Sequence, residues 1–120
     1  MNIEKEFVPY QEALALKEIG FDEPCFATWN GETLDMSLQI PSDDYFTSAP
    51  TFSQAFRWFR EKYEIYYIIE GSKKFGFQHF IYDDKGSYEI KSEETFKNYE
   101  EAELACLNKL IEIVEQQKQK

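Results

Sequence analysis

The chain has 120 residues, with 11 Phe, 8 Tyr, 2 Trp and only 2 Cys. This length suits a single domain with one hydrophobic core, and the aromatic content argues against a disordered chain. A formal net charge of -10 opposes nonspecific binding to nucleic acids and anionic membranes, which are themselves negatively charged. No apolar run is long enough to span a membrane, and we expect no secretory signal in the acidic first residues.

The first predicted element is a short helix over residues 10–19. Pro9 suits the first turn of a helix, and Gly20 suits the position just after its end. The apolar residues of this segment do not share one narrow face, so the prediction depends mainly on these two end signals.

A β-hairpin is predicted next. The segments 25–29 and 32–40 flank Asn30-Gly31, a pair that readily takes the two positive φ angles of a type I′ turn. Apolar and polar residues alternate in the second segment, which indicates a strand with one buried face. Residues 41–50 contain two prolines and two aspartates, and we expect them to form a loop.

A second helix is predicted from a capping box formed by Thr51 and Gln54. Aromatic side chains follow at helical spacing and are expected to face the core, whereas three charged residues face outward. The aromatic residues are Phe52, Phe56, Phe59 and Tyr63, and the outward residues are Arg57, Arg60 and Glu61.

The remainder predicts three strands and a long helix. Residues 65–69 are rich in β-formers, and residues 75–82 and 87–91 flank a turn at 83–86. Asn98 and Glu101 form a second capping box. The apolar stripe of the last helix is expected to lie on the sheet, with a frayed tail at 116–120. Its members are Tyr99, Ala102, Cys106, Leu110, Ile113 and Val114.

These elements predict one α+β domain over residues 1–120. We expect a mostly antiparallel sheet of about five strands and about three helices, packed mainly on one face. Cys25 and Cys106 lie in apolar patterns without metal-ligand spacing and are expected to be small buried hydrophobes. A disulfide between them is not excluded by the sequence, although a chain without an export signal rarely keeps one.

The sequence offers little for catalysis. His79 is the single histidine, and it lies in an aromatic segment where a structural role is commoner than a catalytic one. None of the common hydrolase, metalloprotease or nucleotide-binding motifs occurs. The pairs Asp43-Asp44 and Asp83-Asp84 are typical of solvated turns, so we predict no catalytic residue, metal or cofactor.

Residues 73–80 resemble the first conserved strand motif of RNA-recognition domains, in which aromatic side chains stack on bases. Lysine replaces glycine at the second position and glutamine replaces an aliphatic residue at the sixth. The expected partner strand carries Asp35 where an aromatic is needed. With the negative net charge, a Phe-rich strand that packs a core is the preferred interpretation, and nucleic acid is not expected as a partner.

Two groups of residues are candidates for binding. Arg57 and Arg60, the only arginines, lie one helical turn apart beside Trp58, and such a cluster can hold an anion or anchor a protein interface. A solvated helix face is the simpler interpretation. The second group is acidic, because residues 1–50 carry ten acids and two lysines, a charge of -8. We select from it Asp22, Glu23, Asp35, Asp43 and Asp44.

Three segments, 7–25, 49–63 and 99–113, resemble a group of small uncharacterised proteins of phages and prophages in Bacteroidetes-type bacteria. The resemblance covers about half of the chain. It implies a bacterial cytoplasmic location and a mobile-element context, and it carries over no functional residue.

The resulting hypothesis is a non-enzymatic binding or accessory protein of phage origin that contacts a host or phage protein. In its sharper version the acidic half acts as a decoy that inhibits a host or defence protein, through binding that salt weakens. The alternative is a protein that binds or sequesters a nucleotide or another small anion through Arg57 and Arg60. Self-association through exposed aromatic side chains is left open.

Overall fold

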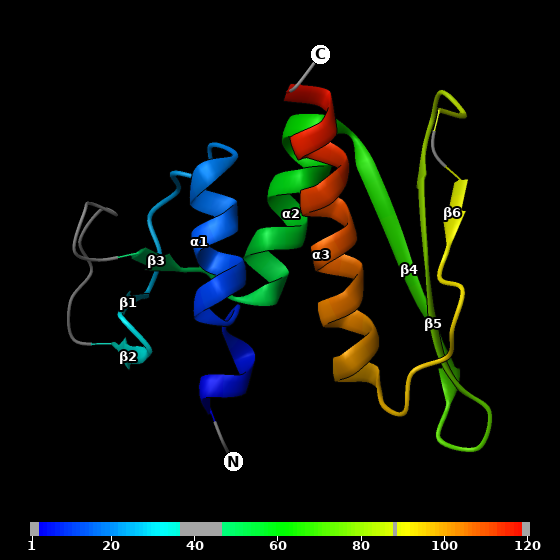
Figure 1. Ribbon diagram of the computed structural model, residues 1–120, viewed down its shortest axis with the longest axis horizontal. Coiled ribbons are helices and arrows are strands. Elements are labelled where there is room, and N and C mark those ends of the chain that lie inside the picture. Colours follow the sequence, from blue (N-terminus) through cyan, green and yellow to red (C-terminus); the bar gives the residue numbers. More distant parts are fainter. Residues whose placement is uncertain (1–2, 37–46, 88, 119–120) are drawn as a thin grey trace. The chain divides into compact units, whose positions relative to one another are not determined.

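The computed structural model describes residues 3–36, 47–87 and 89–118. The chain forms two compact units, Met1–Trp58 and Phe59–Lys120, each with a three-stranded antiparallel sheet (Figure 1). The elements are η1 (Ile3–Glu6), α1 (Tyr10–Glu18), β1 (Ala27–Asn30), β2 (Thr33–Asp35), β3 (Thr47–Ala49), α2 (Phe52–Tyr63), β4 (Ile65–Ser72), β5 (Gly76–Asp83), β6 (Glu89–Lys91) and α3 (Tyr99–Lys118). The α+β class and the three predicted helices are confirmed, while the single domain stays a prediction.

The first helix ends as its sequence predicts. Pro9 precedes α1, and Gly20 follows its last turn with φ of 107°. The N–H of Gly20 donates to the carbonyl of Lys17, and the N–H of Phe21 donates to that of Leu16. This is a Schellman motif, in which a positive φ after the helix satisfies the last carbonyls.

The predicted hairpin is confirmed, but its turn lies one residue later than expected. In the sheet order β2-β1-β3, Asn30 pairs with Thr33, so the two-residue loop is Gly31-Glu32. Gly31 has φ of 59°, and Asn30 keeps a negative φ and belongs to β1. The shift arises because the loop needs a positive φ at its first position, which glycine adopts without steric cost. Described residues of the second strand end at Asp35, and residues 37–46 lie outside the description.

The predicted loop over 41–50 is wrong for its last part. Thr47–Ala49 forms β3, which pairs antiparallel with β1, and all three of its residues are buried. Small polar residues gave this segment no apolar alternation. Its pairing depends on a tertiary neighbour, because Val8 donates its N–H to the carbonyl of Pro50 at 2.8 Å and fixes the chain there.

The second helix begins at its predicted cap. The Oγ1 of Thr51 accepts a hydrogen bond from the N–H of Gln54 at 3.1 Å. Phe56 and Phe59 are fully buried, and Arg57 and Arg60 are exposed, as the helical spacing predicts. The helix ends at Tyr63, and Glu64 follows with a positive φ of 56° before the next strand begins.

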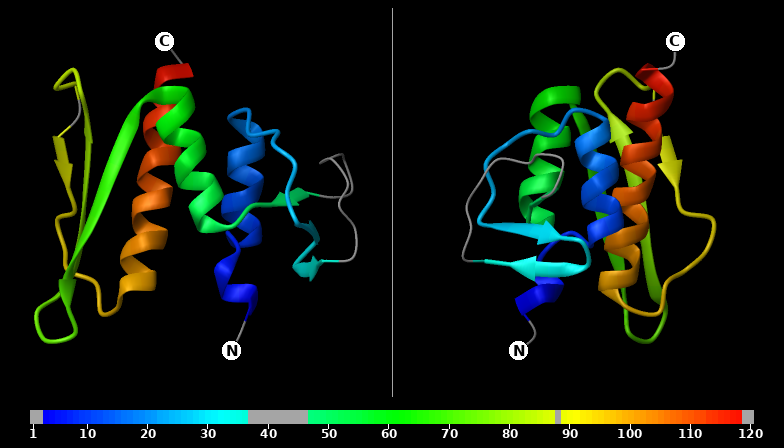
Figure 2. Two further views of the ribbon diagram at one scale, coloured as in Figure 1. Left: turned by 180° about the vertical axis from the view of Figure 1, so that it is seen from behind. Right: turned by 60° about the vertical axis from the view of Figure 1, so that its left-hand side comes forward.

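The second sheet has the order β4-β5-β6, and β4 and β5 pair along their full lengths, from Ile65 with Asp83 to Ser72 with Gly76. Figures 1 and 2 show α3 running along one face of this sheet. The side of the sheet toward α3 includes Ile81, fully buried, and Phe77, whose ring contacts that of Tyr99. The expected hairpin between β5 and β6 is confirmed.

The last helix is capped as predicted. The N–H of Glu101 donates to Oδ1 of Asn98 at 2.8 Å, and the Glu101 carboxylate accepts from the N–H of Lys97. The helix continues through Lys118, into the segment expected to fray. The predicted stripe is wrong for Tyr99, which is 41% exposed at the first turn, and it gains Leu107 and Ile111. The buried residues of the helix are Ala102, Cys106, Leu107, Leu110, Ile111, Ile113 and Val114.

One prediction about the architecture needs correction. The described strands number six and form two separate sheets, where the sequence predicted about five strands in one. The additional strand is β3, which makes the first hairpin into a complete small sheet. Strand patterns along a sequence indicate which residues alternate but not which strands share hydrogen bonds.

Candidate functional site

The predicted arginine cluster divides into exposed and buried members. Arg57 and Arg60 are exposed on α2, whereas Trp58 is only 4% exposed and its ring packs edge-on against Phe21 at 5.5 Å. Trp58 therefore stabilises the core of the first unit and does not offer its ring at the surface beside the arginines.

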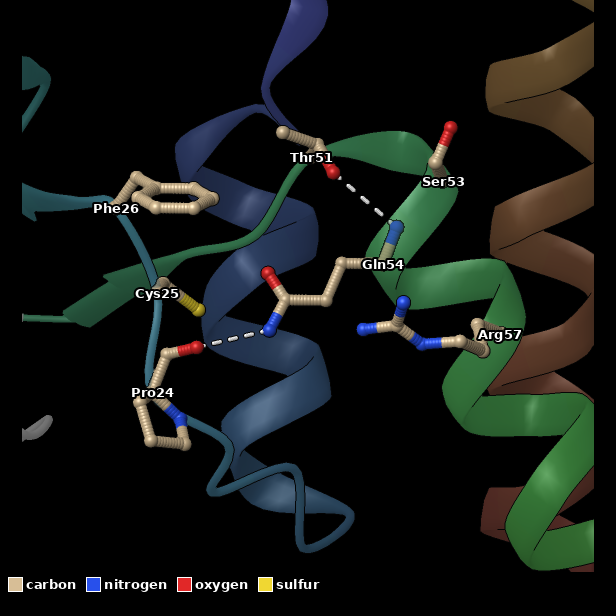
Figure 3. A pocket seen from close by; sticks show the side chains of 7 residues that line it. All are labelled: Pro24, Cys25, Phe26, Thr51, Ser53, Gln54 and Arg57. Carbon is tan, nitrogen blue, oxygen red and sulfur yellow. Dashed lines mark hydrogen bonds between the residues drawn. The ribbon is translucent and has the colours of Figure 1, made fainter.

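Arg57 lines a shallow hollow of about 450 Å³ at the start of α2 (Figure 3). The hollow also involves the chain segment before β1, where Phe26 is 68% exposed. In Figure 3 the Arg57 side chain extends from α2 toward the side of the hollow where Gln54 and Cys25 lie. The lining residues are Pro24, Cys25, Phe26, Thr51, Ser53, Gln54 and Arg57.

The polar groups of this hollow form hydrogen bonds within the protein, chiefly between α2 and the segment before β1. The amide of Gln54 donates to the carbonyl of Pro24 at 2.9 Å and to Oε1 of Glu23 at 3.4 Å. The Cys25 thiol donates to the Glu23 carbonyl, and burial, followed by the charge of Glu23, raises the pKa of this thiol to about 11. A thiol that stays protonated at neutral pH is a poor nucleophile. The hollow is consequently a structural junction with one arginine at its margin.

The predicted acidic residues occupy different segments. Asp22 is exposed and Glu23 is half-buried in the segment after α1, and Asp35 ends β2 opposite Thr28. Asp43 and Asp44 lie outside the described residues. Glu23 joins Gln54 at the hollow described above, so one of the five acids contributes to the packing of α2.

His79 lies on the α3 side of the second sheet and is 5% exposed. Its ring stacks on Phe96 at 6.2 Å, and its backbone N–H donates to Oγ of Ser92 at 3.1 Å. Burial lowers the pKa of the imidazole below its ordinary value, and the charge of Lys109 lowers it further. The side chain is thus neutral near pH 7, and its surroundings are those of a core residue, as the sequence favours.

Among the described residues, no group of three or more His, Cys, Asp or Glu side chains could hold a metal ion. Asp83 accepts a hydrogen bond from the N–H of Ser87 at 2.8 Å, which is the turn-forming role expected for it. Both cysteines are free, with Cys106 fully buried and Cys25 half-buried. Across the same described ranges, no helix is both long and apolar enough to span a membrane.

The RNA-type motif does not present its aromatic residues as a stacking surface. Phe77 points to α3, where its ring contacts that of Tyr99 at 6.1 Å, and its backbone pairs with Phe96. Phe75 lies in the β4–β5 turn and is 76% exposed. The two aromatics that would stack on adjacent bases are therefore on different surfaces.

The opposite face of the second sheet carries a different aromatic group. The register places Tyr66 beside Tyr82 and Ile68 beside Phe80 on the side away from α3. The rings of Tyr66 and Tyr82 lie 5.6 Å apart, and those of Phe80 and Tyr82 lie 5.8 Å apart. Ile68 is 46% exposed, and Figure 1 shows no helix of this unit on that side. We call these four side chains the open face.

Acidic side chains surround the open face. Glu70 is the next residue of β4 on the same side as Ile68, and Glu89 pairs with Tyr82. The charge of Asp84, then burial, then the charge of Glu64 raise the pKa of Tyr66, so both carboxylates lie close to its hydroxyl. Lys91, which pairs with Phe80, is the basic member of the β4–β6 register on this side. The open face therefore has an apolar centre and a mainly negative margin.

Sequence reasoning found the strands of the open face but not the face itself. The sequence signal for this face was that large side chains occur on both sides of two strands, Ile65–Ser72 and Gly76–Asp83. A strand covered on one face usually places polar residues on the other. Tyr66, Ile68, Phe80 and Tyr82 depart from that pattern.

Comparisons of the chain with protein-family models, with curated proteins and with solved structures find no match.

Proposed function

We propose that the protein is a non-enzymatic binding module and that the open face of the second unit contacts another protein. The observation that carries the proposal is the group of Tyr66, Ile68, Phe80 and Tyr82 on a sheet face without a covering helix. Tyrosine and other aromatic residues supply most of the binding energy in many interfaces, because they bury a large area at a small entropic cost.

The margin of the open face indicates the chemistry of the partner. Four carboxylates, from Glu64, Glu70, Asp84 and Glu89, accompany one lysine, Lys91, and the whole chain has a net charge of -10. Such a margin repels phosphate groups and attracts lysine and arginine. The partner that fits is a protein surface with an apolar centre and a basic margin.

An accessory role for this contact in a bacterial cell is the context that the resemblance to phage and prophage proteins implies. The decoy version of the hypothesis becomes more specific, because acids of the second unit join those of residues 1–50 as contributors to the negative field. Association should then be fast at low salt and slower as salt rises, since screening weakens long-range attraction.

The experiment uses a photo-crosslinking amino acid in place of Tyr82 to capture the partner in cells, followed by calorimetry with the purified partner. We expect Ile68→Lys to weaken binding by about 30-fold or more, because a hot-spot substitution at the centre of an interface costs about 2 kcal/mol or more. Phe75→Ser is the matched control, since Phe75 is also exposed but lies in the turn. A partner that binds the wild type and Ile68→Lys with equal affinity would refute the proposal.

A further inference from the structure

An open hollow of about 720 Å³, called the cavity below, lies between β6 with the segment that follows it and α3. His79, Ile90, Phe96 and Ala105 line it with buried or half-buried side chains. This volume falls within the range of about 300–1,000 Å³ typical of small-ligand sites. The remaining lining residues are Lys91, Ser92, Glu93, Glu94, Asn108, Lys109 and Glu112.

His79 contributes an unpaired hydrogen-bonding atom. Its Nδ1 is buried and has no partner in the part of the chain that the structure describes. The backbone of Ala102 raises the pKa of the imidazole, as a carbonyl acceptor does, and since Nδ1 is the atom without a partner, we assign the proton to Nε2. Nδ1 then carries a lone pair, and leaving such a buried acceptor unpaired costs about 1–3 kcal/mol. Nδ1 of His79 therefore lacks a hydrogen-bond donor.

The charged lining residues favour a positive ligand. Lys109 is already paired with Glu112, at 3.4 Å between Nζ and Oε1. Lys91 pairs with Phe80 in the sheet, and this register directs its side chain to the open face. Glu93 and Glu94 are exposed and line the cavity, so its charge balance is negative.

We propose that this cavity binds a small primary ammonium ion with an apolar body. The N–H groups of the ligand donate to Nδ1 of His79, and the carboxylates of Glu93 and Glu94 balance its charge. The apolar body lies against Ile90 and Phe96. Because Nδ1 is shielded from solvent, binding includes a side-chain displacement at the cavity floor.

The probe is isoamylamine, added to the full chain while backbone amide shifts are followed by NMR. We expect the largest shifts at Ser92, Phe96 and Ala105, with saturation at about 10 mM or below. The trimethylated quaternary form of the same amine has the same charge but no N–H donor, and it should bind at least about tenfold more weakly. Isovalerate, an anion of similar shape, should not bind.

Two substitutions at the cavity have opposite expected effects. Lys109→Met removes a positive charge and frees Glu112, so affinity for isoamylamine should rise about two- to fivefold, whereas Glu94→Gln should lower it by a similar factor. Lys85→Met is the control, because it changes the net charge equally at an exposed turn outside the cavity.

Three results would overturn the inference: equal binding of the quaternary form, weaker amine binding in Lys109→Met, or no amide shifts at the cavity. The open face lies on the other side of the sheet from His79. Ile68→Lys should therefore leave amine binding unchanged. Loss of protein binding at the open face and loss of amine binding at the cavity can thus be told apart.

Discussion

Protonation of His79 should destabilise the fold at mildly acidic pH. Burial and then Lys109 lower the pKa of this imidazole in the folded chain below its ordinary value of 6.5. Below that value the unfolded chain binds a proton that the folded chain does not. The stability that the neutral ring contributes is therefore complete above about pH 6.5 and is lost as pH falls toward the lower, folded-state pKa.

The size of the effect has an upper limit. While the imidazole stays neutral in the folded chain, the loss of folding stability depends only on protonation of the imidazole in the unfolded chain. It reaches at most about 1 kcal/mol between about pH 6.5 and about pH 5.5. The chain has one histidine, so no other imidazole contributes to this range.

Urea unfolding followed by circular dichroism at about pH 7.5, 6.5 and 5.5 measures the free energy of unfolding. His79→Phe is the comparison, because it removes the titrating ring and keeps an aromatic side chain against Phe96. The wild type should lose stability over this range more steeply than the variant. Parallel pH profiles for the two proteins would refute the reasoning.

Three further substitutions test the packing and the caps, each through the same urea measurement. Asn98→Ala removes the acceptor for the N–H of Glu101 and should cost about 1 kcal/mol; no change would exclude a capping role. Leu110→Ala creates a cavity at a 1% exposed position of α3 and should cost about 2–5 kcal/mol, whereas a loss below about 1 kcal/mol would contradict its burial. Trp29→Phe loses the buried bond from Nε1 to the carbonyl of Val8 at 2.9 Å and should cost about 1–3 kcal/mol; an unchanged midpoint would speak against that bond.

Local signals predicted the helices well. Pro9 and Gly20 mark the two ends of α1, and the side chains of Thr51 and Asn98 cap the next two helices with bonds of 3.1 Å and 2.8 Å. Each of these signals acts within one helical turn, so it is complete in the sequence.

Features that depend on distant residues were not predicted. β3 exists because Ala49 pairs with Ala27, and nothing in Thr47–Ala49 alone indicates a strand. The turn at Gly31 moved by one residue because the register of β1 with β2 determines which residue takes the positive φ. In both places pairing across the sheet overrides local preference.

In the candidate site, too, local features were predicted and features that depend on distant residues were not. Exposure of Arg57 and Arg60 was predicted from helical spacing, but burial of Trp58 depends on Phe21, a residue from another part of the chain. The open face required knowing which side of β4 and β5 meets α3. That information comes from tertiary packing, as do the cavity beside His79 and its unpaired Nδ1.

The two tryptophans give the molecule a built-in optical label. Trp29 and Trp58 are both buried and both belong to the unit Met1–Trp58, whereas the single histidine belongs to Phe59–Lys120. Tryptophan fluorescence therefore reports melting of the first unit, and the NMR signal of the imidazole reports melting of the second. Coincident transitions would mean that the whole chain melts as one cooperative unit, and separated transitions would identify two.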